Sequence, residues 1–261
     1  MMSLSDLDLT SPLGRVLKKL SDSLLPKGMV VPIMKGPSRG MKWIVGSSNH
    51  SCLLGSYELP KRKAMQKFVK AGMTAYDLGA HVGYFTLLLS RLVGERGTIY
   101  AFEPLAENCL VLRRHLQLNN LSNVVLQECA VSDTQGEVVF FQDPCNYEGT
   151  IVTHEVAKKA KASFKVPTMA LDDFVYSLGN RPPDFIKMDI EGAEYLACLG
   201  MERILKEYQP IMFIALHWSE VGKECCAFLN MLRYKIVTLD HAPLNDHDQD
   251  MLEIIALPGH L

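Results

Sequence analysis

The stretch Ala75-Tyr-Asp-Leu-Gly-Ala-His-Val-Gly-Tyr-Phe-Thr86 decides the fold class of this chain. An apolar run ends in Asp77, Gly79 and Gly83 frame a tight turn, and a helical pattern begins directly after the turn. Glycine permits both the turn conformation and a close approach of the backbone to a ligand. We therefore expect the first strand–turn–helix of a doubly wound, Rossmann-like α/β fold, in which ligands bind beyond the carboxyl ends of the strands.

The spacing of this turn indicates which ligand it holds. A dinucleotide fingerprint requires G-x-G-x-x-G, whereas this chain has D-x-G-x-x-x-G, with Ala80 and His81 between the glycines. A carboxylate at Asp77 would repel a pyrophosphate, but it suits a cationic ligand that carries an ammonium and a sulfonium. That description fits S-adenosylmethionine, while a tight turn without a ligand stays open as the alternative.

Two further strand ends carry candidate cofactor contacts. Thr98–Glu103 ends in a carboxylate 20 residues after Gly83, a spacing at which the acid can accept hydrogen bonds from both ribose hydroxyls. The third strand ends at Glu128-Cys129-Ala130, where the fold would place the adenine edge.

Outward from this stretch, strand patterns alternate with helical ones, which predicts a mostly parallel sheet with helices on both faces. The expected strands are Ala75–Leu78, Thr98–Glu103, Val124–Glu128, Glu137–Phe141, Lys165–Met169, Asp184–Asp189, Ile211–His217, Tyr234–Leu239 and Met251–Leu257. The expected helices are Lys61–Lys70, Phe85–Leu92, Ala106–Leu118, Leu171–Leu178, Ala193–Leu205 and Lys223–Leu232.

The sequence predicts two regions, an N-terminal extension over residues 1–71 that covers the site and a cofactor-binding domain over 72–261. The extension contains short strand patterns at Val30–Met34 and Lys42–Val45, and an amphipathic helix that begins at Ser11-Pro12 and is stopped by Pro26 and Gly28. This helix either packs on its own domain or a neighbouring subunit, or lies on a membrane surface.

Composition excludes several classes of protein. Of the 261 residues, 48% are hydrophobic and 21% charged, which excludes global disorder. The net charge of -2 argues against nonspecific nucleic-acid binding, and the six apolar residues Ile211–Leu216 are too few to span a bilayer. Asp6 and Asp8 argue against a secretory signal, and seven cysteines without C-x-x-C argue against a disulfide framework. We therefore expect a cytoplasmic location.

Several of these motifs together resemble the FkbM family of S-adenosylmethionine-dependent methyltransferases, which have the class I fold. The matching stretches spread over most of residues 53–217; they are L-L-G-S-Y-E at Leu53–Glu58, Y-D-L-G-A-H-V-G-Y-F-T at Tyr76–Thr86, Y-A-F-E-P at Tyr100–Pro104, A-V-S-D-T-Q-G at Ala130–Gly136 and I-K-M-D-I-E-G-A-E at Ile186–Glu194. The resemblance implies seven strands with the last one antiparallel, and methylation of a hydroxyl oxygen on a small-molecule or sugar-like acceptor.

Fold position and resemblance together assign the cofactor contacts to Asp77, Gly79, Ala80, Gly83, Glu103, Pro104, Glu128, Ala130, Asp189 and Glu58. Among these, the resemblance places Asp77, Gly79 and Gly83 at the methionine end, Glu103 at the ribose and Ala130 near the adenine. The chain departs from the family at Ala215-Leu-His217, where members often have a glutamate two residues before the histidine. In this chain, either no residue has the role of that glutamate, or another residue has taken it over.

Asp189, Glu191 and His217 are the candidate catalytic residues. Methyl transfer from a sulfonium is an in-line displacement, so the protein aligns the reactants and handles the acceptor proton. If the fourth and fifth strands are neighbours, Asp189 and His217 meet over the methyl group, and either could take the proton while Glu191 orients the acceptor. A buried Lys187–Asp189 pair and helix capping by the glutamates are the purely structural alternatives.

Other readings of the site remain open. Asp189 and Glu191 leave room for a divalent cation, although no ligand spacing demands one. Tyr57 and Glu58 are candidates to close over the cofactor, and the irregular segment 142–164 is either an acceptor lid or a solvated insertion. A nicotinamide-dependent oxidoreductase and a non-catalytic cofactor-binding protein are the alternative functions. No nucleic-acid partner and no stable membrane insertion are expected, whereas the sequence leaves a homo-oligomer open.

Overall fold

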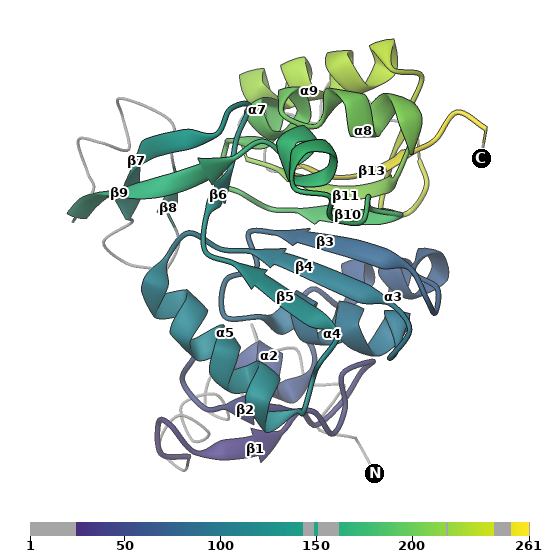
Figure 1. Ribbon diagram of the computed structural model, residues 1–261. Coiled ribbons are helices and arrows are strands. Elements are labelled where there is room, and N and C mark those ends of the chain that lie inside the picture. The colour runs from purple at the N-terminus through teal and green to yellow at the C-terminus, as the bar shows by residue number, and fades with distance from the viewer. Residues whose placement is uncertain (1–24, 143–148, 151–161, 218, 243–251, 261) are drawn as a thin grey trace.

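The computed structural model describes residues 25–142, 149–150, 162–217, 219–242 and 252–260 (Figure 1). Its main sheet has seven strands in the order β12-β13-β11-β10-β3-β4-β5. Neighbouring strands are parallel except for β13, which is antiparallel to both of its neighbours. The predicted doubly wound sheet with an antiparallel last strand is confirmed. The strands are β3 (Thr74–Leu78), β4 (Thr98–Phe102), β5 (Val124–Gln127), β10 (Phe185–Met188), β11 (Ile211–Leu216), β12 (Lys235–Thr238) and β13 (Leu252–Leu257).

The centre of the sheet is buried on both faces, as parallel strands covered by helices require. Every residue of β3 and β10 is buried. Ala75 and Phe185 belong to one core cluster, whereas Tyr76 and Ile186 belong to another. Because chain order reverses between β3 and β10, a topological switch point lies at their carboxyl ends, where ligands bind in open α/β sheets.

Helices cover both faces of the main sheet. Figure 1 shows α7, α8 and α9 on one side and α3, α4 and α5 on the other. The bounds are α3 (Leu59–Phe68), α4 (Tyr84–Val93), α5 (Ala106–Leu118), α7 (Glu194–Leu199), α8 (Glu202–Glu207) and α9 (Ser219–Met231). The helix expected over 171–178 is a π-helix, η1, over Asp173–Ser177. No helix of the described residues combines the length and apolar composition needed to cross a membrane.

The prediction of one continuous helix over Ala193–Leu205 is wrong. The helix breaks at Gly200, where a Cβ would lie 2.0 Å from the carbonyl oxygen of Ser132. Asp172 then starts α8 as a cap, because its carboxylate accepts hydrogen bonds from the backbone N–H groups of Arg203 and Ile204, both at 2.9 Å. A side chain from a distant segment therefore determines this boundary, and helical periodicity does not show it.

A second, four-stranded sheet with the order β6-β9-β7-β8 is inserted between β5 and β10. Its strands are β6 (Ala130–Val131), β7 (Gly136–Gln142), β8 (Gly149–Thr150) and β9 (Ala162–Met169). The strands expected at Glu137–Phe141 and Lys165–Met169 exist, and they pair with each other as β7 and β9 outside the main sheet. Most of the candidate lid segment, residues 143–148 and 151–161, lies outside the described residues.

The N-terminal cover comprises the antiparallel strands β1 (Val30–Pro32) and β2 (Lys42–Ile44), the helix α2 (His50–Leu54), and α3. Trp43 of β2 is buried and stacks on His115 of α5 with ring centroids 4.2 Å apart. Trp43 shares a core cluster with Ala75 of the main sheet. The cover is thus packed into the same core as the sheet. The helix expected from Ser11 to Leu24 lies outside the described residues.

Candidate active site

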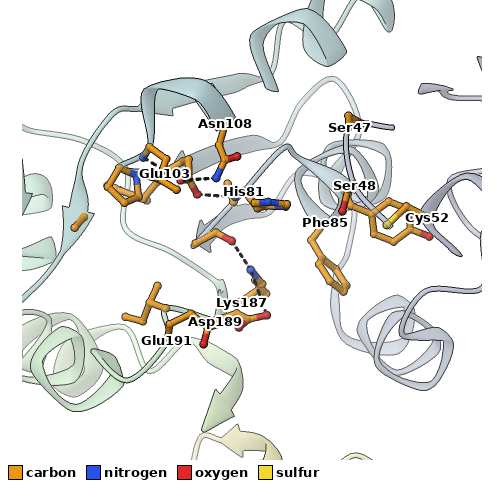
Figure 2. A pocket seen from close by; sticks show the side chains of 18 of the residues that line it. Ser47, Ser48, Cys52, His81, Phe85, Glu103, Asn108, Lys187, Asp189 and Glu191 are labelled. Carbon is orange, nitrogen blue, oxygen red and sulfur yellow. Dashed lines mark hydrogen bonds and ion pairs between the residues drawn. The ribbon is translucent and has the colours of Figure 1, made fainter. Parts of the chain in front are cut away.

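A pocket of about 590 Å³ opens at the carboxyl ends of β3, β4 and β10 and is bounded on one side by residues 46–57 of the cover. Its volume is within the range of ordinary small-molecule sites. Figure 2 shows Glu103 and Asn108 on one side of this pocket, Asp189 and Glu191 on another, and Ser47, Ser48 and Cys52 of the cover on a third. The predicted site residues that line it are Gly79, Ala80, Glu103, Pro104, Ala130, Asp189 and Glu191.

The turn after β3 forms the floor of the pocket. The N–H groups of Gly79 and Ala80 both donate to the carbonyl of Phe102, at 3.0 and 2.9 Å. A Cβ on Gly79 would lie 1.9 Å from the carbonyl oxygen of Asp189, so only glycine fits between β3 and β10. Gly83 does not line the pocket; a Cβ there would lie 2.2 Å from Leu112 Cδ1. Gly83 therefore allows α4 and α5 to pack closely.

Asp77 lies beneath this turn and does not line the pocket. Its side chain is fully buried, 3.2 Å from Lys187 Nζ, and accepts a hydrogen bond of 2.6 Å from Thr86 Oγ1. Lys187 Nζ also donates to the carbonyls of Gly79 at 2.8 Å and Leu78 at 3.3 Å. The buried pair in this structure joins Lys187 to Asp77, with Asp189 further away at 4.0 Å. A role of Asp77 toward the cofactor stays a prediction.

Glu103 is a buried carboxylate that faces the pocket. Oε1 accepts from the Leu105 N–H at 3.0 Å and Asn108 Nδ2 at 3.1 Å, and Oε2 accepts from the His81 N–H at 2.8 Å. Burial raises the pKa of Glu103, and these three donors oppose the rise. A carboxylate offers about four acceptor positions, so Oε2 retains one for a ribose hydroxyl.

The other predicted cofactor residues separate into two groups. Ala130 and its neighbours Cys129 and Val131 line the pocket next to the second sheet. Glu128 is exposed and pairs with Arg113 on the outside of the molecule. Glu58 does not line the pocket either, because its carboxylate turns to Lys61 at 3.0 Å.

Asp189 and His217 meet at the ends of β10 and β11. His217 Nε2 lies 3.3 Å from Asp189 Oδ1, while Asp189 Oδ2 faces Lys61 at 3.8 Å and Lys187 at 4.0 Å. Burial alone would raise the pKa of Asp189, but Lys187, the hydrogen bond from His217 and Lys61 outweigh it and hold the pKa well below its usual range. Asp189 is therefore an ionised carboxylate at the pocket wall.

His217 is held by carboxylates on both ring nitrogens. Nδ1 lies 2.9 Å from Glu194 Oε1, and Nε2 lies 3.5 Å from Glu191 Oε1 as well as close to Asp189. Burial alone would lower its pKa, but the hydrogen bonds to Asp189 and Glu194 and the charge of Glu191 raise the pKa to about 10. His217 is consequently an imidazolium near neutral pH, and it lies behind Asp189 without lining the pocket.

A comparison with family models identifies the family of this chain. The family model described as the methyltransferase FkbM domain matches residues 77–252. The chain belongs to the FkbM family of S-adenosylmethionine-dependent methyltransferases.

Individual relatives of this FkbM chain are distant. Methyltransferase 1 of Beauveria bassiana is 27% identical over 143 residues, which cover 48% of this chain and 57% of that protein. A solved FkbM methyltransferase from Methylobacillus flagellatus KT is 19% identical with a TM-score of 0.47, covering 70% of this chain and 43% of that one. A solved fibrillarin from Aeropyrum pernix, with natively bound S-adenosyl-L-methionine, is 17% identical with a TM-score of 0.46, covering 73% and 68%. The chain thus spans about half the length of the first two relatives.

In this FkbM domain, Asp189, Glu191 and His217 also form a group that could hold a metal ion, since one ligand atom of each lies within 4.8 Å of the others. Glu191 reaches the group from a left-handed backbone, with φ 53°. A metal would need the lone pair of His217 Nε2, which the proton on the imidazolium occupies. Cation binding at this group therefore competes with protonation of His217.

Sequence reasoning missed Lys61, which joins the cover to the site. Lys61 is buried, and its Nζ lies 2.7 Å from Glu253 Oε1, 3.0 Å from Glu58 and 3.8 Å from Asp189. Glu253 on β13 stands directly opposite Ala215 on β11. The available signal was a lone charge inside the apolar run 252–257. His81, also missed, lines the pocket.

Proposed function

We propose that this chain is an S-adenosylmethionine-dependent methyltransferase that methylates a hydroxyl oxygen of a small-molecule or sugar-like acceptor. The observation that carries the proposal is one pocket with a buried acid that has a spare acceptor position, Glu103, at one end and an ionised carboxylate, Asp189, at another. A reducing, cytoplasmic setting, as expected from the cysteine pattern, belongs to the same proposal.

The pocket residues fit the chemical groups of this cofactor. Glu103 Oε2 has an acceptor position left for a ribose hydroxyl, and the apolar wall of Cys129, Ala130 and Val131 suits the face of an adenine ring. Acidic side chains outnumber basic ones around the opposite end, which favours a ligand that carries positive charge.

The cover supplies the wall that an acceptor would meet. It contributes the polar residues Ser47, Ser48, Asn49 and Tyr57 to the pocket lining. Hydroxyl and amide groups recognise hydroxylated molecules through hydrogen bonds, which is why we favour a sugar-like or otherwise hydroxylated acceptor over an apolar one.

Asp189 is the residue that we assign to the acceptor proton. When bound, S-adenosylmethionine supplies a methyl group on a sulfonium leaving group. Asp189 is ionised and lines the pocket, so it can accept a hydrogen bond from the acceptor hydroxyl and orient its oxygen. Its low pKa makes it a weak base, so it takes the proton late, when the new carbon–oxygen bond has made the hydroxyl acidic. His217, already protonated, holds Asp189 in place through the contact of 3.3 Å. Glu191 is placed to orient the acceptor.

Methyl transfer from labelled S-adenosylmethionine to a panel of sugars, glycosides, catechols and aliphatic alcohols tests the proposal, with products identified by mass spectrometry. We expect a methyl ether on at least one hydroxylated acceptor. Asp189→Asn should lower the rate by about 100-fold or more, a much larger effect than its effect on the binding of S-adenosylhomocysteine. Glu137→Gln, at an exposed pair with Lys165, serves as the matched control. Cofactor binding without transfer to any acceptor would favour a non-catalytic role instead.

Dependence on a divalent cation is tested in the same assay. Because Lys61 and Lys187 already lie close to Asp189 and offset its charge, we expect methyl transfer to continue after dialysis against EDTA. A rate that collapses with EDTA and returns with Mg²⁺ would show that Asp189, Glu191 and His217 act as metal ligands.

A further inference from the structure

His81 has a left-handed backbone, which is uncommon among residues other than glycine. The turn after β3 has positive φ at three alternate positions, Gly79 at 76°, His81 at 50° and Gly83 at 96°. A left-handed conformation is unfavourable for a residue with a side chain, and glycine avoids that cost. His81 keeps this conformation with its N–H bonded to Glu103 Oε2 at 2.8 Å. Strain of this kind concentrates at functional sites.

The side chain of His81 ends in an unused polar atom inside the pocket. His81 lines the pocket, and Figure 2 shows its ring near the centre of the pocket, between Glu103 and the cover. Nε2 is buried and has no hydrogen-bond partner among the described residues. Buried polar atoms of folded proteins are nearly always bonded, so this nitrogen points to a ligand group.

The chemistry of His81 defines what that ligand group must offer. Burial, reinforced by the charge of Lys187, lowers the pKa of His81 to about 4, against a smaller opposing effect of Asp189. The ring is therefore neutral at physiological pH, and in the Nδ1–H tautomer Nε2 carries a lone pair. In that tautomer the missing partner is a hydrogen-bond donor, and a cationic ligand group selects it over the Nε2–H tautomer.

Lys187 removes the acceptors that the turn would otherwise offer to a cationic ligand. Its Nζ contacts the Asp77 carboxylate and donates to the carbonyls of Gly79 and Leu78. Asp77 is fully buried under this lysine, away from the pocket. Other acceptors that line the pocket include His81 and the carboxylates of Asp189 and Glu191.

The position of His81 matches one part of the proposed cofactor. Its own N–H bonds Glu103, the acid proposed for the ribose, and its ring lies in the same pocket. Beyond the ribose, the cofactor carries the sulfur and then the amino-acid arm with its α-ammonium. We propose that His81 Nε2 accepts a hydrogen bond from this α-ammonium, in the role that the sequence motif would give to Asp77. The inference rests on the proposed function, because it needs the same cofactor in the same pocket.

Isothermal titration with two probes tests this contact without an acceptor. The probes are S-adenosylhomocysteine and its deaminated analogue, in which hydrogen replaces the α-ammonium and the carboxylate remains. The variant His81→Gly removes the ring and suits the positive φ. We expect it to weaken S-adenosylhomocysteine about 10- to 100-fold, the worth of a hydrogen bond to a charged group, and to leave the deaminated analogue within about threefold of wild type.

His81→Asn is the second variant, because asparagine tolerates the left-handed region and its shorter side chain ends before the position of Nε2. This variant should also lose affinity for S-adenosylhomocysteine and keep its affinity for the deaminated analogue. The Tm of each variant without ligand shows whether the fold is kept. Equal weakening of both probes, or no weakening of either, would overturn the proposal. Failure of the wild-type chain to bind S-adenosylhomocysteine at all would contradict the proposed function itself.

Discussion

At the scale of single residues, the buried pair of Asp77 and Lys187 makes the sharpest prediction about stability. Asp77→Asn leaves the lysine charge buried without a counter-ion, since both side chains are at most 3% exposed. Removal of one partner from such a pair costs about 3–5 kcal/mol. Urea unfolding of the variant should show a loss of this size.

The double variant Asp77→Asn, Lys187→Met is the matched control for that pair. It has no unpaired charge, so most of the lost free energy of unfolding should return. A single variant as stable as wild type, or a double variant no better than the single one, would mean that the pair does not hold the turn to β10.

His217 makes a prediction about pH. Its pKa is near 6.5 when unfolded and about 10 when folded, so between these values the folded chain holds the extra proton. Stability from His217 is fully present below pH 6.5 and is lost as the pH rises toward 10. His217→Gln should therefore destabilise the chain more at pH 6 than at pH 9.5 in urea unfolding, and exposed His260→Gln serves as the control. An equal cost at both pH values would contradict the raised pKa.

How far the site could be read from sequence differs from residue to residue. Gly79 and Glu103 were predicted because they follow predicted strands at characteristic spacings, and the pocket contains both. The burial of Asp77 could not be predicted, because a strand-end acid has the same sequence pattern whether a lysine covers it or a ligand does. Lys61 was missed because it meets Asp189 and Glu253 only after three distant segments come together.

At the scale of elements, the β3–α4 turn depends on a glycine that packs against another strand. Gly79→Ala places a Cβ 1.9 Å from the Asp189 carbonyl oxygen, at φ 76°. Left-handed strain and overpacking together should cost about 2–5 kcal/mol. Gly179→Ala, with φ 72° and no atom within 4 Å, should cost only the strain, about 1–2 kcal/mol. Equal decreases in Tm in the two variants would show that close packing against the end of β10 does not require a glycine in this turn.

The element order was readable from the sequence because long buried strands and amphipathic helices differ in hydrophobic period. The sequence did not show which of the two sheets each strand joins. β7 and β9 have ordinary strand patterns, and only their mutual pairing shows that they form a second sheet. The break between α7 and α8 was hidden for a related reason, since it depends on contacts of Gly200 and Asp172 with other segments.

At the scale of the whole molecule, the cover and the sheet form one structure around the pocket. The cover contributes Trp43 to the core and Lys61 to the charge network of Asp189. The boundary expected near residue 71 therefore separates two stretches of sequence whose side chains share one hydrophobic core. Deleting the cover should expose core surface and remove one wall of the pocket, so a chain that starts near residue 72 should unfold at lower temperature and bind the cofactor more weakly.

The most direct test of the account is calorimetric titration of the full chain with S-adenosylhomocysteine and with NAD. We predict saturable binding of S-adenosylhomocysteine, no binding of NAD at the same concentrations, and a clear loss of affinity in Glu103→Gln, because the amide cannot reproduce an acceptor on both oxygens. Binding of NAD in place of S-adenosylhomocysteine, or affinity for S-adenosylhomocysteine that is unchanged by Glu103→Gln, would contradict it.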